Sequence, residues 1–247
     1  MPAYADPVVL DSVCNAEEEI PMPELSRNIV DDLDSLDDIN SVSTDSWRTL
    51  RLMAESVTAF DTLNAVQNDC VSIFGSARPK EDSQDYKNTV AVARALGECG
   101  LGIITGGGPG LMEAANRGAV EAGAPSIGLS MELPNEQGTN QYVRIHCNFR
   151  YFSLRKFMFV KYSKAFVVMP GGGGTLDEMS ETLVLAQTQK IKTTLILYDR
   201  SFWQGLFDWM NGPMLQRGYI RADEMQKHFL FADSPEEVVQ ILKGRIL

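Results

Sequence analysis

The chain of 247 residues, 44% of them hydrophobic, is long enough to bury a sizeable core, and its net charge is −11. Residues 1–46 carry twelve acidic residues and one basic residue, whereas residues 47–247 carry 21 of each sign. We therefore predict a flexible acidic segment over 1–46, with an acidic interaction tail as the alternative, and a single domain over 47–247. A body without basic excess argues against nucleic acid as the main ligand.

The four cysteines, Cys14, Cys70, Cys99 and Cys147, are scattered and form no CxxC pair. This pattern predicts reduced thiols in a cytoplasmic protein rather than a disulfide framework or a zinc site. No apolar stretch approaches the roughly 20 residues of a membrane span, and the N-terminus lacks the features of a signal peptide. We expect no membrane association.

From residue 47 onward, short apolar runs alternate with helical patterns. The expected helices cover 47–66, 86–100, 110–123, 153–164, 175–190, 202–215 (helical until Pro213) and 234–244. The expected strands cover 71–75, 101–105, 126–131, 142–147, 165–169 and 194–198. This alternation is typical of the α/β class: a Rossmann-like, doubly wound parallel sheet with helices on both faces. Such sheets bind ligands at the carboxyl ends of their strands.

Three loops are expected at that edge of the sheet: "GSARP" (75–79), "GGGPG" (106–110) and "PGGGGTLDE" (170–178). The two glycine-rich loops each lead into a helix, whose first N–H groups and partial positive charge bind anions, phosphate above all. Glycine lets these N–H groups approach a phosphate without a Cβ clash. Thr175 could cap its helix and donate a hydroxyl hydrogen bond. Two such loops in one sheet predict nucleotide or sugar-phosphate binding.

The second loop bears only a weak likeness to a dinucleotide-binding fingerprint. Pro109 occupies one of its spacer positions, and Glu132 is the one acid near the usual distance from it. We therefore expect neither a nicotinamide cofactor nor any other cofactor, and no metal.

Two carboxylates, Asp177 and Glu178, follow the third loop. Asp177 is explained by the helix dipole, which favours acids in a first turn. Glu178 falls opposite the expected core stripe and thus one turn from the anion site, where it could act as a base or stabilise positive charge. That stripe consists of Leu176, Met179, Leu183 and Ala186.

Arg155 and Lys156 stand near the start of the helix opened by Ser153, where a cation is unfavourable. Either the pair is exposed and without consequence, or it faces a bound anion or the Glu178 carboxylate. A phosphate cradle, a carboxylate and an arginine suit hydrolysis at a sugar C1, which passes through an oxocarbenium-like transition state.

These motifs resemble the Lonely Guy family. "SLRK" is followed by "PGGGGTLDE", with Arg155 and Glu178 23 positions apart, and "FGSARP" and "TGGGPGLMEAANRGA" also fit the family pattern. The resemblance covers about residues 70–200 and indicates a longer subtype. Members are cytokinin riboside 5′-monophosphate phosphoribohydrolases, often mislabelled lysine decarboxylases. It implies hydrolysis of nucleoside 5′-monophosphates, such as AMP or isopentenyladenosine monophosphate, to free base and ribose 5-phosphate.

The resemblance places the catalytic pair on Arg155 and Glu178. The expected substrate-binding residues are Gly75, Ser76, Gly107, Gly108, Glu132, Lys156, Gly172, Gly173, Gly174, Thr175, Leu176 and Asp177. Val184 stands where short members carry threonine, which leaves the base preference open.

The family also implies a homodimer or higher homo-oligomer. Leu185, which we expect to be exposed, and the aromatic residues Phe157, Phe159 and Tyr162 fit a partner surface, or else they pack within one subunit.

Three other functions are weighed against hydrolysis. A non-catalytic module that binds a nucleotide or a phosphorylated cofactor needs no carboxylate opposite the phosphate. A single-strand DNA binder needs a basic stripe with interleaved aromatic residues, which the body lacks. A lysine decarboxylase needs a Schiff-base lysine for pyridoxal phosphate, and Lys156, beside Arg155, is the one lysine near the loops.

Overall fold

The computed structural model of the chain describes residues 42–132, 138–221 and 228–246. The chain divides into two units, Met1–Thr49 and Leu50–Leu247, and the fold below is that of the second unit. The predicted division into 1–46 and 47–247 stays a prediction, because residues 1–41 lie outside the described ranges.

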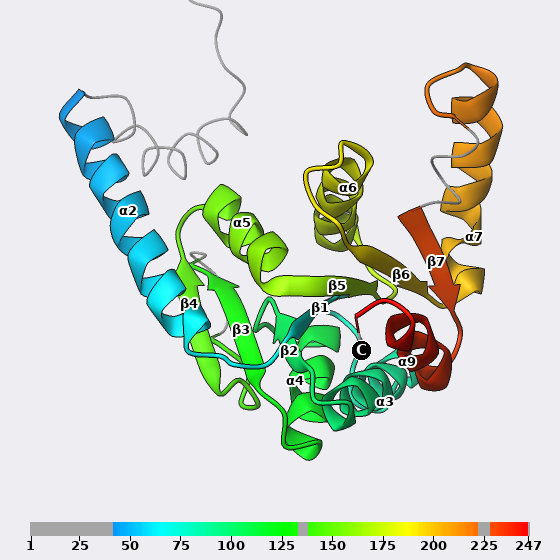
Figure 1. Ribbon diagram of the computed structural model, residues 1–247, viewed down its shortest axis with the longest axis horizontal. Helices are drawn as coiled ribbons and strands as arrows, with labels where there is room; N and C mark the ends of the chain where they lie inside the picture. The colour runs from blue at the N-terminus through cyan, green and yellow to red at the C-terminus, as the bar shows by residue number, and fades with distance from the viewer. Residues whose placement is uncertain (1–41, 133–137, 222–227, 247) are drawn as a thin grey trace, which may run out of the picture. The chain divides into compact units, whose positions relative to one another are not determined.

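A parallel sheet forms the centre of this unit, with seven strands in the described ranges (Figure 1). Their order is β4-β3-β2-β1-β5-β6-β7. The strands are β1 (Cys70–Phe74), β2 (Gly102–Thr105), β3 (Ser126–Met131), β4 (Ile145–Phe149), β5 (Ser163–Val168), β6 (Thr194–Tyr198) and β7 (Phe229–Ala232). Every residue of β1, β2 and β6 is buried. Burial on both faces explains why these strands read as continuous apolar runs.

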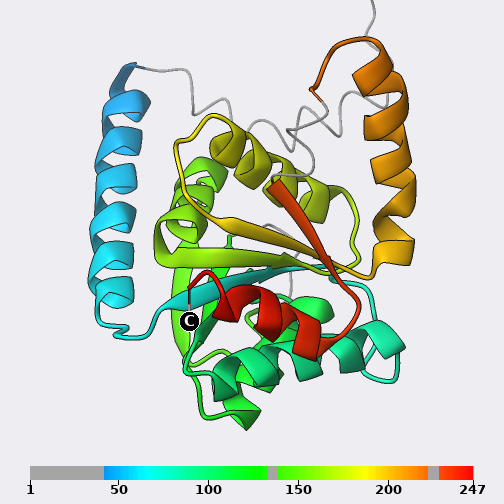
Figure 2. The ribbon, with the colours of Figure 1, turned by 45° about the vertical axis from the view of Figure 1, so that its right-hand side comes forward.

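Helices cover both faces of the sheet, so the predicted α/β class is confirmed (Figures 1 and 2). One core contains side chains of α3 (Gln84–Glu98), α4 (Leu111–Glu121) and α9 (Pro235–Lys243). The opposite core contains side chains of α2 (Val42–Asn64), α5 (Phe152–Tyr162), α6 (Gly173–Gln187) and α7 (Arg200–Trp209). The strands feed both cores in alternation: in β1, Val71 and Ile73 join the first core, and Phe74 joins the second.

Serine caps fix where two of these helices begin. Ser83 accepts a hydrogen bond from the Tyr86 N–H before α3, and Ser234 accepts one from the Glu237 N–H before α9. Each cap satisfies one of the N–H groups that a helix start leaves without a partner. The starts of α4 and α6, described below, have no such side-chain cap among the described residues.

The strand order reverses beside β1, and this reversal positions the site. The chain runs outward from β1 through β2 and β3 to β4, then returns to β5, which pairs with β1 from Val71↔Ala165 to Phe74↔Val168. At such a switch point the loops that follow the strands diverge and leave a crevice. The loops after β1, β2 and β5 are the three loops predicted from the sequence.

Three details differ from the sequence predictions. The strand expected over 142–147 begins later, at Ile145, and ends at Phe149. The strand β7 was not predicted. The helix expected over 202–215 is α7 followed by a π-helical turn, η1 (Met210–Met214), which contains Pro213. Proline lacks an N–H, so the regular helical hydrogen bonding cannot pass through it.

No helix in the described part of the chain is both long enough and apolar enough to cross a membrane.

Candidate active site

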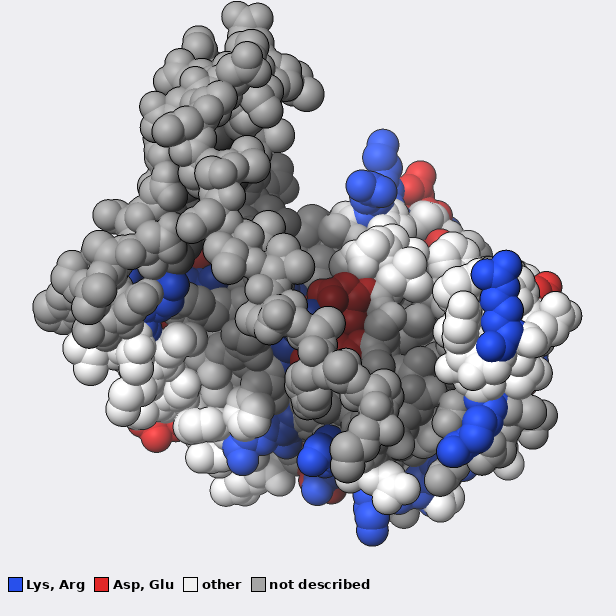
Figure 3. Space-filling model, turned by 90° about the horizontal axis from the view of Figure 1, so that it is seen from above, with Lys and Arg blue, Asp and Glu red and all other residues white. Residues whose placement is uncertain are grey.

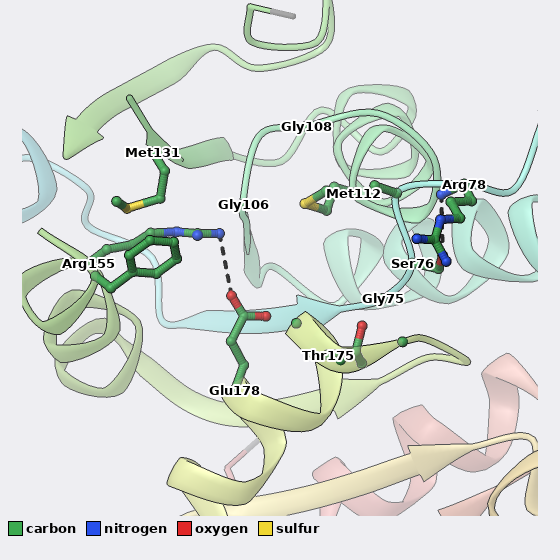
Figure 4. A pocket seen from close by; sticks show the side chains of 15 residues that line it. Gly75, Ser76, Arg78, Gly106, Gly108, Met112, Met131, Arg155, Thr175 and Glu178 are labelled. Atoms are coloured by element: carbon green, nitrogen blue, oxygen red, sulfur yellow. Dashed lines mark hydrogen bonds and ion pairs between the residues drawn. The ribbon is translucent and has the colours of Figure 1, made fainter. Parts of the chain in front are cut away.

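A cavity of about 360 Å³ opens at the switch point (Figure 4). Residues of all three predicted loops line it, together with residues from the end of β3 and the start of α5. Nine predicted site residues are among them: Gly75, Ser76, Gly108, Arg155, Gly172, Gly173, Gly174, Thr175 and Glu178. The fold thus brings together positions that are up to 103 residues apart in the sequence (75 to 178).

The backbone of Ser76 ties the three loops to one another. Its N–H donates to the Pro170 carbonyl at 3.2 Å, and its carbonyl accepts from the Leu111 N–H at 2.9 Å. Gly75 allows this approach, because a Cβ there would lie 2.9 Å from the Leu111 Cβ. The loop after β1 is therefore a bridge between the loop after β5 and the start of α4.

The glycines that open α6 face open space. A Cβ at Gly172, Gly173 or Gly174 would meet no atom of the described residues within 4 Å. Gly172 is the N-cap, and no described side chain caps this helix, so its first N–H groups keep their capacity for a ligand. The suggestion that Thr175 caps the helix is wrong: Thr175 lies inside α6 and is buried.

The loop after β2 is held from behind by side chains. The Gly107 N–H donates to the Thr105 hydroxyl at 2.9 Å, and the Asn140 amide donates to the carbonyls of Gly107 and Gly108, both at 3.0 Å. Because a trans peptide is planar, a Gly107 carbonyl turned toward Asn140 turns the Gly108 N–H in the opposite direction. Gly110, the N-cap of α4, also has no side-chain cap among the described residues.

Arg155 and Glu178 meet inside the cavity, as Figure 4 shows. The Arg155 Nη2 lies 3.4 Å from the Glu178 Oε1, and only 13% and 17% of the two side chains are exposed. The guanidinium also lies over the Phe159 ring, 5.3 Å from its centroid. Gly106 gives it room, since a Cβ there would lie 2.5 Å from the Arg155 Nη2. Of the two sequence-based alternatives for Arg155, the structure shows the one in which it faces the carboxylate.

Glu178 has an unusual pKa for a carboxylic acid. Burial raises the pKa of its carboxyl from 4.5 to about 7, and the neighbouring Arg155 guanidinium offsets only part of that effect. A carboxyl with this pKa changes protonation near neutral pH, which suits an acid or base in catalysis.

Lys156 points to a different set of partners. Its Nζ lies 2.8 Å from the Asp177 Oδ1 and 2.9 Å from the Glu181 Oε2, so two carboxylates of α6 neutralise it. Lys156, Leu176 and Asp177 do not line the cavity. Leu176, expected in the core stripe, is 38% exposed.

A second cavity, of about 280 Å³, lies beside the first and contains the remaining predicted residues, Gly107 and Glu132. Glu132 lines its edge and forms an ion pair with Arg150, whose Nε lies 2.6 Å from the Glu132 Oε2. The structure therefore separates Glu132 from the Arg155–Glu178 pair.

Six residues that line the first cavity were missed in the sequence: Ala77, Arg78, Gly106, Met112, Met131 and Phe152. Arg78 stands within the loop "GSARP", and Met131 is the last residue of β3, so the rule of strand carboxyl ends could have found both. Met112 and Phe152 sit at helix starts that only the assembled fold brings to the cavity.

Figure 3 shows how the charged side chains of the described residues are distributed on one face of the molecule. On the face seen in Figure 3, Lys and Arg side chains are spread over the described surface, and acidic side chains lie in a hollow near its centre. Within the described residues, no group of three or more His, Cys, Asp or Glu side chains could hold a metal ion.

The fold and the glycine-lined cavity define a Rossmann-like α/β protein whose site lies at the switch point of a parallel sheet. The model of the family described as "Possible lysine decarboxylase" matches residues 112–242, more than half of the chain. The chain belongs to this family, which is the Lonely Guy family that its motifs resemble. No curated protein matches the chain.

Solved structures share the fold at low sequence identity. A molybdenum cofactor binding protein from Rippkaea orientalis is 22% identical, with a TM-score of 0.55 over 73% of this chain and 99% of its own. The molybdenum cofactor carrier protein of Chlamydomonas reinhardtii is 20% identical, with a TM-score of 0.54 over 73% and 99%. The protein TM1055 is 21% identical, with a TM-score of 0.53 over 71% and 99%.

Proposed function

We propose that the chain hydrolyses the N-glycosidic bond of nucleoside 5′-monophosphates, such as AMP or isopentenyladenosine monophosphate, and releases free base and ribose 5-phosphate. The observation that carries this proposal is the largely buried Arg155–Glu178 pair, 3.4 Å apart, in a cavity that the start of α6 also lines. A phosphate site and a carboxylate at the reacting carbon are the two parts that this hydrolysis needs.

The phosphate is placed at the start of α6. Gly172, Gly173 and Gly174 leave open space in front of an uncapped helix N-terminus, where N–H groups and the helix dipole favour an anion. Gly108 and Arg78 line the same cavity. The Gly108 N–H and the Arg78 side chain add hydrogen-bond donors on the other side of the phosphate.

Glu178 is placed at the reacting carbon. As the bond between C1′ and the base nitrogen breaks, its electron pair leaves with the base and positive charge develops on the sugar, which an ionised carboxylate stabilises. A water molecule then bonds to C1′ and transfers one proton to Glu178, which passes it to the departing base. Arg155 lowers the pKa of Glu178, although less than burial raises it, and so favours the carboxylate that begins the reaction.

We do not propose the activity in the family description. A Schiff-base lysine must lose its proton to attack pyridoxal phosphate. Burial alone would lower the pKa of Lys156, but hydrogen bonds to Asp177 and Glu181 outweigh burial and leave this pKa above its ordinary value. The side chains around Lys156 therefore do not fit that cofactor.

A non-catalytic module that binds a nucleotide or a phosphorylated cofactor is the second candidate. Its support is the shared fold of the two structures titled as molybdenum cofactor binding and carrier proteins. A carrier has no use for a carboxylate beside the ligand's phosphate-binding groups, and on this point Glu178 favours the enzyme.

The proposal includes a homo-oligomer in the cytosol. Phe152 and Phe157 of α5 and Val184 of α6 are each about half exposed, which suits a partner surface. Phe159, expected in this surface, is instead buried at 2% exposure, and Leu185 is partly buried. The free thiols of the cysteines in the described ranges fit a reducing compartment. Sedimentation velocity would test the oligomer.

The decisive experiment incubates the purified protein with AMP, isopentenyladenosine monophosphate, GMP and CMP and separates free bases by chromatography. Base release by the wild type, abolished in Glu178→Gln, would support the hydrolase. Tight binding of a nucleotide in calorimetry with no base released from any of the four would replace it with the carrier.

A further inference from the structure

The second cavity continues the first toward the edge of the sheet. The two cavities share Gly106, Gly108 and Met131 in their walls. In Figure 4, Arg155 and Met131 lie on one side of Glu178, and Thr175 and Ser76 lie on the other. A ligand whose phosphate lies at Thr175 and whose C1′ lies at Glu178 therefore extends past Met131 toward the second cavity.

Four side chains with hydrogen-bonding groups, Ser130, Thr139, His146 and Asn148, line this second cavity. The His146 Nε2 lies 3.0 Å from the Thr139 hydroxyl and 3.1 Å from the Ser130 hydroxyl. The strand register pairs Gly128 with His146 and Ser130 with Asn148, so these side chains stand on one face of the sheet. Each hydroxyl has one donor and two acceptor positions, so it can bond to His146 and to a ligand at once.

The same residues are fixed to the glycine loop behind the first cavity. Thr139 precedes Asn140, which bonds to Gly107 through its backbone N–H at 2.8 Å and through its side chain at 3.0 Å. A Cβ at Gly107 would lie 2.7 Å from the Ser130 hydroxyl oxygen. The hydroxyls thus stand at set positions relative to the groups placed at the phosphate.

The charges of the cavity argue against a second anion. Glu132 contributes a carboxylate at its edge, and the Arg150 guanidinium is engaged in the ion pair with Glu132. Among the described residues of its wall, Met131 is the one long apolar side chain, so an alkyl group would cover the hydrogen-bonding positions of the two hydroxyls that His146 does not use and offer them no partner. Hydrogen-bonding groups that a ligand covers without replacing their water weaken its binding.

We propose that the second cavity binds the hydrogen-bonding edge of the base through Ser130, Thr139 and His146, and so selects purine nucleotides with an unalkylated base over prenylated ones. This inference rests on the proposed function, because the order of phosphate, C1′ and base along the cavities comes from it. The Met131 thioether, which lines both cavities, lies where it can contact the face of the ring.

Calorimetry tests the inference separately from turnover. In the Glu178→Gln background, AMP, isopentenyladenosine monophosphate and ribose 5-phosphate are titrated into the protein, then into proteins that also carry Thr139→Val or His146→Phe. We expect AMP to bind at least tenfold more tightly than either other ligand. Each added substitution should remove most of the AMP advantage and leave ribose 5-phosphate affinity within twofold.

Thr58→Val, which removes a hydroxyl from the exposed face of α2, is the matched control and should change none of the three affinities. Melting temperatures confirm that each variant is folded. Equal or tighter binding of the prenylated nucleotide, or equal losses for AMP and ribose 5-phosphate, would overturn the inference. Base-dependent binding without base release by the wild type would overturn the proposed hydrolysis alone.

Discussion

The two glycine loops at the cavity look alike in sequence but differ in what surrounds them. In the loop after β2, a Cβ would lie 2.5 Å from the Arg155 guanidinium at Gly106, 2.7 Å from the Ser130 hydroxyl oxygen at Gly107 and 2.6 Å from the Ser76 carbonyl oxygen at Gly110. In the loop after β5, a Cβ at Gly172, Gly173 or Gly174 would meet none of the described atoms within 4 Å. The protein itself requires the glycines of the first loop.

Glycine occurs in the two loops for two different reasons, which the sequence alone cannot distinguish. The loop after β2 needs glycine for its own packing and for positive φ angles, +74° at Gly107 and +68° at Gly110. In the loop after β5, Gly171 has such a need, because a Cβ there would clash with Thr175, but Gly172, Gly173 and Gly174 do not. These three glycines are explained by something that approaches from outside the chain. The following predictions test that difference.

The largest expected effect concerns Glu178, the carboxylate that follows the loop after β5. If a substrate reacts in the open space beside this loop, activity requires Glu178. Glu178→Gln should lower kcat for base release at least a thousandfold, because the amide can neither accept the proton nor carry the negative charge. Glu181→Gln, one turn further along α6, is the control and should keep kcat within threefold. Comparable losses in both variants would mean that the Glu178 effect reflects the charge of the helix rather than the reaction.

Gly110→Ala should be the most destabilising change in either loop. The new Cβ would meet backbone atoms of Ser76 and Ala77 at a positive φ, and we expect a loss of about 3 kcal/mol in the free energy of unfolding, measured by urea denaturation. Gly100→Ala shares the positive φ, at +85°, with no described atom within 4 Å, and should lose only about 1 kcal/mol. Equal losses would show that crowding contributes nothing.

The raised pKa of Glu178 predicts how activity and stability change with pH. Since burial raises this pKa from 4.5 to about 7 and the carboxylate is the reactive form, kcat/KM should fall about tenfold per pH unit below 7. Stability moves the opposite way. The folded state favours the protonated form of the Glu178 carboxyl, so its ionisation lowers the free energy of unfolding. This loss is absent below pH 4.5, grows between pH 4.5 and 7 and is complete above pH 7.

Glu178→Gln should therefore unfold less readily than the wild type above pH 7, by a difference on the order of 3 kcal/mol that vanishes below pH 4.5. Chemical denaturation at a series of pH values measures it. A difference between the two proteins that stays constant from pH 4 to 8 would show that the carboxyl titrates normally.

Gly173→Ala should have the smallest effects of these changes. It should lower the affinity for AMP but raise the free energy of unfolding. A ligand phosphate at the start of α6 would clash with the methyl group, so AMP affinity should fall about tenfold in calorimetry. Stability should rise by about 0.4–1 kcal/mol, because alanine loses less backbone entropy on folding. Gly205→Ala, in α7 with no described atom near its Cβ, should show the stability gain without the loss of affinity. Unchanged affinity for AMP in Gly173→Ala would remove the ligand as the reason for these glycines.

The sequence was sufficient for the architecture and for the edge that carries the site. Fully buried strands such as β1 and β6 leave unambiguous apolar runs, and the rule of strand carboxyl ends then selects the loops. The pairing of Arg155 with Glu178 was one of two alternatives, because a period of 3.6 residues gives the face of a helix but not its neighbour.

The sequence predictions that were wrong concern features that tertiary contacts determine. Thr175 fits the sequence pattern of a cap, yet α6 begins at Gly173, so Thr175 is part of the helix and buried. The strand β4 was predicted to begin too early because Val143 and Ile145 alternate with Arg144 in a strand-like pattern, while pairing with β3 begins at Ile145. The second cavity could not have been foreseen, since it depends on Thr139 reaching His146 across a loop.

The hydrogen bonds that tie Ser76 to Pro170 and Leu111 all run between main-chain atoms. These bonds use no side-chain atom, whereas six of the ten residues that line the second cavity carry side chains. Mutation can therefore rework ligand preference residue by residue while the backbone frame of the cavity persists. The same backbone fold can therefore bind a series of related ligands after changes of side chains alone.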